Sequence, residues 1–207
     1  MSGDLFGGVR IPGLVHLPGF AVDEAGLIAA AEAVAAVSPF RVMAVPSGAK
    51  MSAAITNCGA AGWVSDRRGY RYQGLDPDTG ATWPEMPAVF RDLAAQAAAR
   101  AGFAGFVPDV CLMNRYAPSA KMGLHQDRDE VDFTAPIVSV SLGLPAVFLW
   151  GGPKRTDKTL RLPLASGDVV VWGGEERLYF HGIAPIKPGQ HRLLGAARLN
   201  LTFRRAL

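Results

Sequence analysis

Three side chains in the second half of the chain have the types and spacing of a metal site. His125 and Asp127 are separated by a single residue, and a second histidine, His181, follows much later. Two imidazoles and one carboxylate can occupy three positions on non-haem Fe(II) and leave three positions open for reactants. An H-x-D pair also arises by chance, so it indicates a metal only beside other residues that serve the same chemistry.

The last predicted strand, residues 198–204, offers a partner for such a metal. Side chains of a strand alternate between its two faces, which separates an apolar set from a polar set. The apolar set is Leu199, Leu201 and Phe203, and the polar set is Arg198, Asn200, Thr202 and Arg204. Arginine binds carboxylates in a bidentate way, so the polar face predicts a pocket for a dicarboxylate. The alternative is a half-exposed edge strand with solvated arginines.

An earlier predicted strand adds two polar side chains. Asn114 and Tyr116 share one of its faces, at positions where a core strand more usually carries Val or Ile. An amide and a phenol can both donate hydrogen bonds to a bound carboxylate. Together with the three metal ligands and the arginines, they predict a metal centre with an anionic chelator.

A scaffold of strands is needed to bring these residues together. Beyond Pro108, short β-branched or alternating runs are separated by Gly and Pro, which predicts a mostly β (α+β) fold of the jelly-roll type. The eight expected strands are 109–116, 121–127, 136–142, 145–150, 159–164, 168–172, 179–184 and 197–204. We expect His125 and Asp127 to point to the same side of one of them.

Two helices are predicted upstream, where they would brace the sheet. Asp23 is placed to cap an Ala-rich helix that ends before Ser38. Pro87 opens a second helix, which ends before Gly102. Proline at the start and glycine past the end are the residues that helix ends favour.

The remaining segment, residues 40–86, is rich in Gly, aromatic and basic residues and is predicted to form hairpins over the barrel mouth. Trp63 and Tyr70 lie there and could stack on a planar ligand. The chain therefore divides into an N-terminal extension and helix (1–39), these hairpins (40–86), and a helix followed by the jelly-roll core (87–207). Gly151-Gly152 and Gly173-Gly174 are both interpreted as hairpin turns.

Composition sets the broad class of the protein. Of the 207 residues 49% are hydrophobic, and the net charge of +3 with pI near 9.1 permits a polyanionic partner without requiring one. Cys58 and Cys111 are interpreted as structural thiols in a reducing compartment. The chain has no signal pattern and no apolar stretch long enough to span a bilayer. We therefore expect a cytoplasmic protein that does not associate with a membrane. His16 and His191 lack ligand spacing and are expected at the surface or in hydrogen bonds.

The ordered motifs of the chain closely resemble those of the bacterial AlkB dealkylases. The matching segments cover nearly its whole length: Thr56-Asn57-Cys58-Gly59, Gly69-Tyr70-Arg71-Tyr72, Asn114-Arg115-Tyr116-Ala117-Pro118, Leu124-His125-Gln126-Asp127, 137–143, 167–174, His181-Gly182-Ile183 and Asn200-Leu201-Thr202-Phe203-Arg204. Val45 and Ala49 depart from the family pattern, because its best-known member has hydroxyl-bearing residues there.

The resemblance implies a double-stranded β-helix dioxygenase that uses Fe(II), 2-oxoglutarate and O2 to strip alkyl groups from nucleic-acid bases. It implies that iron is bound by His125, Asp127 and His181. It implies that 2-oxoglutarate is held by Asn114, Tyr116, Arg198, Asn200 and Arg204. For the substrate it implies a nucleotide-recognition lid and contacts from Trp63, Tyr70, Asp129 and Arg155.

The implied substrates are 1-methyladenine and 3-methylcytosine in DNA, single-stranded DNA being favoured, with RNA as a second candidate and a monomer as the expected state. The products would be formaldehyde, succinate and CO2. Two alternatives stay open. One is a 2-oxoglutarate dioxygenase that acts on tRNA, a protein or a small molecule, since one fold serves many substrates. The other is a catalytically silent jelly-roll binding module.

Overall fold

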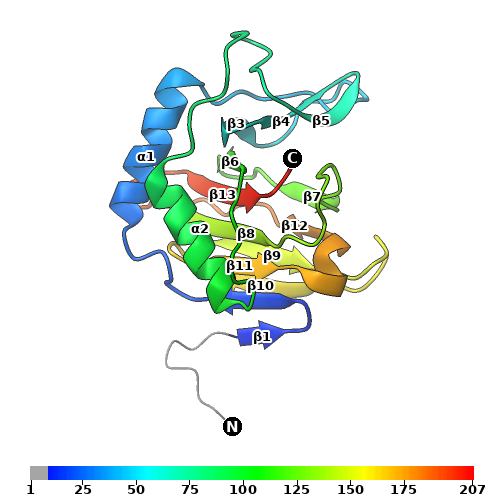
Figure 1. Cartoon of the computed structure of the whole chain (residues 1–207). Coiled ribbons are helices and arrows are strands. Elements are labelled where there is room, and N and C mark those ends of the chain that lie inside the picture. Colours follow the sequence, from blue (N-terminus) through cyan, green and yellow to red (C-terminus); the bar gives the residue numbers. More distant parts are fainter. Residues whose placement is uncertain (1–8) are drawn as a thin grey trace.

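In the computed structural model, residues 9–207 are described; residues 1–8 of the predicted N-terminal extension lie outside this range. Two antiparallel sheets face each other, as a jelly roll requires (Figure 1). The larger has the order β1-β2-β11-β8-β13-β6-β3, and the smaller has the order β10-β9-β12-β7. A separate hairpin, β4-β5, lies beside them.

The strands of the larger sheet are β1 (Val9–Ile11), β2 (Leu14–Leu17), β3 (Ala54–Gly59), β6 (Val110–Tyr116), β8 (Ile137–Gly143), β11 (Val169–Trp172) and β13 (Arg198–Arg204). Those of the smaller sheet are β7 (Met122–His125), β9 (Ala146–Trp150), β10 (Leu160–Leu164) and β12 (His181–Ile183). The hairpin consists of β4 (Gly62–Asp66) and β5 (Gly69–Gln73). The eight strands expected beyond Pro108 are confirmed as β6 to β13.

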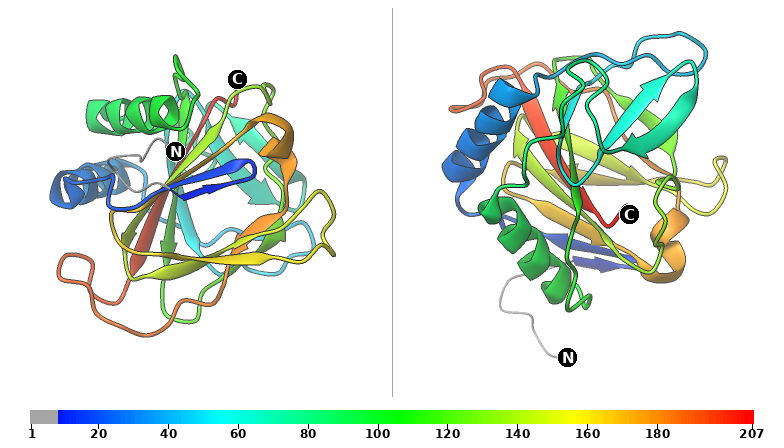
Figure 2. Two further views of the ribbon diagram at one scale, coloured as in Figure 1. Left: turned by 90° about the horizontal axis from the view of Figure 1, so that it is seen from below. Right: turned by 45° about the horizontal axis from the view of Figure 1, so that its top comes forward.

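Both predicted helices are present, as α1 (Glu24–Val37) and α2 (Ala88–Arg100). They lie side by side against the outer face of the larger sheet (Figures 1 and 2). The Asp23 carboxylate accepts a hydrogen bond from the Gly26 amide at 2.9 Å, which confirms the predicted N-terminal cap. Gly102 follows α2 with φ of +102°, a conformation that glycine adopts without strain.

The alternation of β13 separates two cores. Leu199, Leu201 and Phe203 pack toward the helices with α1 and α2 residues. The opposite face points between the two sheets, where a second core contains Tyr116, Phe148, Trp150 and Trp172. All seven residues of β13 are buried and the strand lies between β8 and β6. The edge-strand alternative is therefore wrong.

Several local predictions need correction. The expected strand 121–127 ends at His125, so Asp127 lies in the following loop. Gly173-Gly174 is not a hairpin turn, because Gly174 begins a 3-10 helix, η1 (Gly174–Leu178), that joins β11 of one sheet to β12 of the other. Within the segment expected to form hairpins over the mouth, β3 pairs with β6 at the edge of the larger sheet.

The β1-β2 hairpin was not predicted. It adds two strands beside β11, and its turn contains Gly13 at φ of +69°. A Cβ atom on Gly13 would lie 2.3 Å from Cβ of Glu176, so the close approach of η1 also requires glycine. No helix between residues 9 and 207 is long and apolar enough to cross a membrane.

The buried carboxylate of Asp168 links β2 to the start of β11 by hydrogen bonds. Asp168 binds Nε2 of His16 at 2.9 Å and accepts hydrogen bonds from the amides of Gly19 and Ala165, both at 2.9 Å. Burial alone would raise the pKa of Asp168, but His16 and the two amides lower it below its usual value. His16 is thus a hydrogen-bonded histidine, which is one of its two expected roles.

We predict that Asp168→Asn lowers the free energy of unfolding at pH 7 by about 1.5–3 kcal/mol, the usual contribution of hydrogen bonds to a charged group. Because the pKa of Asp168 is lower in the folded than in the unfolded chain, this contribution is present above the usual carboxyl pKa. It is lost as pH falls through the folded value. Denaturant titrations from pH 7 into the acid range should show the two proteins converging. Asp92→Asn, at an exposed position of α2, is the control. An equal difference at every pH would contradict the assignment.

Candidate metal centre

A pocket of about 500 Å³ opens between the two sheets and reaches the β4-β5 hairpin. It brings together most of the residues predicted to do chemistry. Its lining includes Trp63, Tyr70, Asn114, Tyr116, His125, Asp127, Asp129, Arg155, His181, Asn200 and Arg204. Arg198 does not line this pocket and lies deeper, completely buried beneath it.

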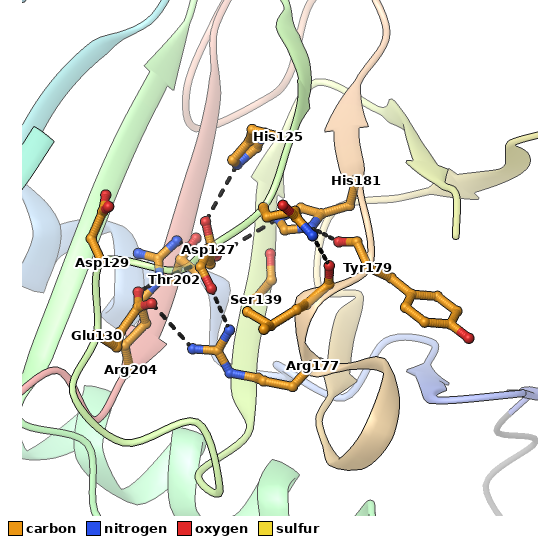
Figure 3. Close-up of polar contacts among 12 residues, drawn as sticks. His125, Asp127, Asp129, Glu130, Ser139, Arg177, Tyr179, His181, Thr202 and Arg204 are labelled. Atoms are coloured by element: carbon orange, nitrogen blue, oxygen red, sulfur yellow. Dashed lines mark hydrogen bonds and ion pairs between the residues drawn. The ribbon is translucent and has the colours of Figure 1, made fainter. Parts of the chain in front are cut away.

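The predicted metal ligands all line this pocket, and their side chains converge (Figure 3). His125 is the last residue of β7 and His181 is the first of β12, and these two residues are direct partners across the antiparallel pair. One ligand atom from each of His125, Asp127 and His181 lies within 4.8 Å of the others. Although Asp127 is not on the strand, the loop after β7 returns its carboxylate to the histidines. This donor set fits Fe(II).

Both histidines are held in the orientation that a ligand requires. Nδ1 of His125 is 2.9 Å from the Gly123 carbonyl oxygen, and Nδ1 of His181 is 3.0 Å from that of Tyr179. A carbonyl accepts but cannot donate, so each Nδ1 carries the proton and each Nε2 keeps a lone pair. The Nε2 atoms lie 3.4 and 3.7 Å from the two carboxylate oxygens of Asp127.

The charges keep two of the three ligands in their binding forms, Asp127 and His181. Although burial lowers the pKa of His125, the hydrogen bond and the charge of Asp127 raise it above its usual value, so this imidazole must be deprotonated when a metal binds. Burial opposes ionisation of Asp127, but Arg204 and the two histidines hold its pKa well below the usual range. Burial and the neighbouring His125 lower the pKa of His181. At neutral pH Asp127 is therefore a carboxylate and His181 a neutral imidazole, as metal binding requires.

A buried ion network holds the loop that carries Asp127. Arg204 donates to Oδ2 of Asp127 from Nη2 at 2.6 Å, and its Nε lies 3.1 Å from Oε1 of Glu130. Arg177, from η1, donates to the backbone carbonyl of Asp127 at 2.8 Å and to that of Ala135 at 3.1 Å. Tyr72 of β5 donates to Glu130 at 2.8 Å. Side chains from β13, from η1 and from the β4-β5 hairpin therefore all hold the loop after β7 that carries Asp127.

A second set of polar side chains lies deeper, where β6 and β13 pair. Tyr116 lies opposite Arg198 and Asn114 lies opposite Asn200 in the register. Nη2 of Arg198 donates to Ser141, and its guanidinium carbon lies 5.2 Å from the centre of the Tyr116 ring. Among the described residues, Nε and Nη1 of Arg198 have no hydrogen-bond partner. A buried cation in this state requires an anionic ligand.

The mouth of the pocket carries the aromatic side chains predicted for substrate. Trp63 of β4 and Tyr70 of β5 are stacked, with ring centres 5.4 Å apart and planes 13° from parallel. The Trp63 indole N–H donates to Oδ2 of the exposed Asp129 at 2.8 Å. Arg155 donates to the Leu124 carbonyl and lies over the Phe180 ring, 4.9 Å from its centre.

The basic residues of the β4-β5 turn are partly neutralised within the hairpin. Arg68 and Arg71 form ion pairs with Asp66 at 3.0 and 2.9 Å. Hydrogen bonds from Arg71 and then Arg68 lower the pKa of Asp66. Arg67 is exposed at the tip of the hairpin. Of the three arginines, Arg67 is thus the one left outside this ion-pair set.

Sequence reasoning missed the residues that support the ligands: Tyr72, Glu130, Arg177, Ser139 and Ser141. Glu130 lies in an acidic stretch of the sequence beside Asp127 and Asp129, which is typical of a solvent-exposed segment, and Arg177 has no recognisable partner in the sequence. A possible signal is that charged residues lie at 127, 130, 177 and 204 among predicted buried strands, where unpaired charge is costly. Their pairing depends on loops whose course no periodicity defines.

We predict that Arg177→Lys weakens metal binding by about 10–100-fold, the usual effect of removing support behind a ligand. Lysine keeps the charge but cannot bridge the Asp127 and Ala135 carbonyls at once. Titration calorimetry with Mn(II) measures the change, and Arg161→Lys, at an exposed position of β10, is the control. Equal Mn(II) affinity in a folded Arg177 variant would contradict the positioning role.

Comparison with known proteins agrees with this geometry. Residues 13–204 match the model of the 2OG-Fe(II) oxygenase superfamily. The chain is 56% identical to the alpha-ketoglutarate-dependent dioxygenase AlkB of Escherichia coli, over 94% of this chain and 90% of that one. It is 46% identical to the AlkB homolog of Caulobacter vibrioides, over 95% and 89%. The solved structure of OsALKBH1 superposes with a TM-score of 0.82 at 33% identity, covering 95% of this chain and 98% of that one. The silent-module alternative is therefore wrong, and the chain belongs to the AlkB family of Fe(II)- and 2-oxoglutarate-dependent dioxygenases.

Proposed function

We propose that this dioxygenase removes alkyl groups oxidatively from nucleic-acid bases such as 1-methyladenine and 3-methylcytosine, with formaldehyde, succinate and CO2 as products. The observation that carries the proposal is the mouth of the pocket. An indole ring and a carboxylate, joined by the Trp63–Asp129 hydrogen bond, line the same pocket as the His125, Asp127 and His181 ligands. A planar cationic ligand would be recognised by an aromatic face and a carboxylate together.

Within this proposal, His125, Asp127 and His181 hold Fe(II). With 2-oxoglutarate and O2, the bound metal supplies the oxidising chemistry that hydroxylates the alkyl carbon attached to a base nitrogen. The protein positions the reactants and keeps water from the site. 2-Oxoglutarate contacts are assigned to Asn114, Tyr116, Arg198, Asn200 and Arg204.

The two arginines have different roles in the proposed binding of 2-oxoglutarate. Arg204 already pairs with the metal ligand Asp127, so it is assigned to the carboxylate nearer the metal. Arg198 is six residues earlier on the same face of β13, and it has Tyr116 opposite it. We assign Arg198 and Tyr116 to the remote carboxylate, because this buried guanidinium is the one that needs a counterion.

Alkylated nitrogens on the pairing edge of a base cannot be reached inside a duplex. The base must be flipped out or the strand must be single, and a lesion that disrupts pairing lowers the free energy of flipping. Single-stranded DNA is accordingly the favoured substrate in this proposal, with RNA as a second candidate. Trp63, Tyr70, Asp129 and Arg155 serve as base or strand contacts.

Three further assignments belong to the same proposal. A monomeric state is sufficient, because the proposed site is built from one chain. A cytoplasmic location agrees with Cys58 and Cys111, which are buried free thiols. The segment 40–86 is assigned as the nucleotide-recognition lid, apart from β3, which is part of the larger sheet. A small-molecule substrate would not require the stacked Trp63 and Tyr70.

We predict that Arg198→Met weakens binding of 2-oxoglutarate by about tenfold or more, which corresponds to losing a charged hydrogen bond of about 1.5–3 kcal/mol. Calorimetry on the Mn(II)-loaded protein measures this affinity without turnover. Arg192→Met, at an exposed position, should bind as the wild type does. If Arg198→Met keeps full affinity, the remote carboxylate lies elsewhere.

We predict that Asp129→Asn reduces demethylation of 3-methylcytosine, which is cationic, more than that of 1-methylguanine, which is neutral. Asparagine keeps an oxygen for the Trp63 N–H but removes the negative charge. The measurement is kcat/KM for each lesion in otherwise identical oligonucleotides, with Asp92→Asn as the matched control. Equal losses for both lesions would remove charge recognition by Asp129 from the proposal.

A further inference from the structure

A surface of positive charge begins at the rim of the pocket and extends away from it. Three segments form this surface, and none of them contains an aspartate or a glutamate: residues 44–54, 115–123 and 184–197. The hydroxyl of Ser52 accepts a hydrogen bond from the Lys121 amide at 3.0 Å, which joins the first segment to the second. The Ile186 amide donates to the Ala120 carbonyl at 2.9 Å, which joins the second segment to the third.

Four exposed basic side chains lie on this surface, which we call the basic ridge: Lys50, Arg115, Lys121 and Lys187. Arg115 joins the ridge as the register partner of Ala54 where β3 pairs with β6. Among the described residues, none of the four side chains has a hydrogen-bond or ion-pair partner. His191, further along the third segment, has the Glu24 carboxylate 3.5 Å from its Nε2, which marks the end of the ridge. Unpaired like charges on one surface attract a partner with repeated negative charge.

The basic ridge is continuous with the pocket. Met51 and Met122 both line the pocket, and Lys50 and Lys121 are their neighbours in the sequence. Lys121 directly precedes β7 and His125 ends it, so roughly 13 Å of extended strand separates this lysine from a metal ligand. A polymer with one unit in the pocket can therefore place its next units on the ridge.

The turn in the middle of the ridge contains a strained serine. Among the described residues, Ser119 is the one non-glycine residue with a positive φ, at 70°. Its amide donates to the Ile186 carbonyl at 2.8 Å, which fixes the turn, while its side chain is exposed. Glycine adopts this φ without strain, whereas serine does so at a cost in stability. An exposed hydroxyl at a strained position points to a ligand for that hydroxyl.

We propose that the basic ridge binds the sugar-phosphate backbone of a nucleic-acid strand beyond the nucleotide that occupies the pocket. The lysines and the arginine supply positive charge, and the Ser119 hydroxyl donates to a phosphate oxygen. This binding surface rests on the proposed function, which it extends to nucleotides that are not themselves repaired. Because its contacts are with phosphates, binding on the ridge is independent of base sequence. It favours long strands over short ones.

The test compares a trinucleotide with a single strand of about 15 nucleotides, each with one central 3-methylcytosine. Fluorescence anisotropy measures binding to the full chain loaded with Mn(II) and 2-oxoglutarate over a range of salt concentrations. We expect Lys187→Gln to weaken binding of the long strand about threefold. Its plot of log K against log salt should become shallower by about 0.7, the contribution of one phosphate contact on a single strand. The affinity for the trinucleotide should not change.

Variants of Ser119 separate binding from folding. Ser119→Gly removes both the hydroxyl and the strain, so we expect a higher Tm together with weaker binding of the long strand. Ser119→Ala removes the hydroxyl and keeps the strain, so it should weaken binding without raising Tm. Arg91→Gln is the control for net charge, because it removes one exposed positive charge on α2, outside the ridge (Figure 1). It should bind both strands as the wild type does.

Three results would overturn the ridge as a strand-binding surface. The first is unchanged affinity of Lys187→Gln for the long strand, and the second is an equal loss in Arg91→Gln. The third is displacement of the long strand by polyglutamate as readily as by unmodified DNA, which would assign the ridge to an acidic protein. If the wild type dealkylates neither strand with Fe(II) and O2, while Lys187→Gln still loses affinity for the long one, the proposed function fails and the ridge stands.

Discussion

The ionised carboxylate of Asp127 is the group on which the rest of the site depends. It must remain charged while it is buried, although removal from water favours the neutral acid. Arg204, 2.6 Å away, reverses this preference, and Glu130 and Arg177 complete a network in which each charge has an opposite neighbour. Removing one member of such a network leaves an uncompensated buried charge, which costs about 3–5 kcal/mol. Metal binding and folding therefore impose the same requirement on these four residues.

β13 places Arg204 beside Asp127 because its two faces have different neighbours. Its apolar face packs against the core beneath α1 and α2, which fixes the strand at the centre of the larger sheet. Its polar face then places Arg204 beside the carboxylate of Asp127 and leaves Arg198 completely buried outside the pocket lining. In the described part of the chain, Arg204 has carboxylate partners whereas Arg198 has none. From that difference we propose that a dianionic cosubstrate places one carboxylate beside the metal and supplies with the other the counterion that Arg198 lacks.

Strand periodicity predicted the larger part of this arrangement. The alternation of residues 198–204 and the shared face of Asn114 and Tyr116 are direct consequences of backbone geometry, and both are found in the structure. The course of the loops was not predictable in this way. Asp127 reaches the histidines from a loop, and Arg177 reaches Asp127 from a 3-10 helix that was expected to be a turn. The β1-β2 hairpin was missed because Pro12 and Gly13 interrupt a short alternating pattern.

The most direct test of the proposed dealkylation is mass spectrometry of a 3-methylcytosine DNA oligonucleotide after incubation with the protein, Fe(II), 2-oxoglutarate and O2. The matching RNA and the Asp127→Ala variant serve as comparisons. We predict that the wild type converts 3-methylcytosine to cytosine with formation of succinate and formaldehyde, and that Asp127→Ala forms none of these products. An unchanged methylated base in both DNA and RNA, despite succinate formation by the wild type, would contradict dealkylation of nucleic acid as the function of this site.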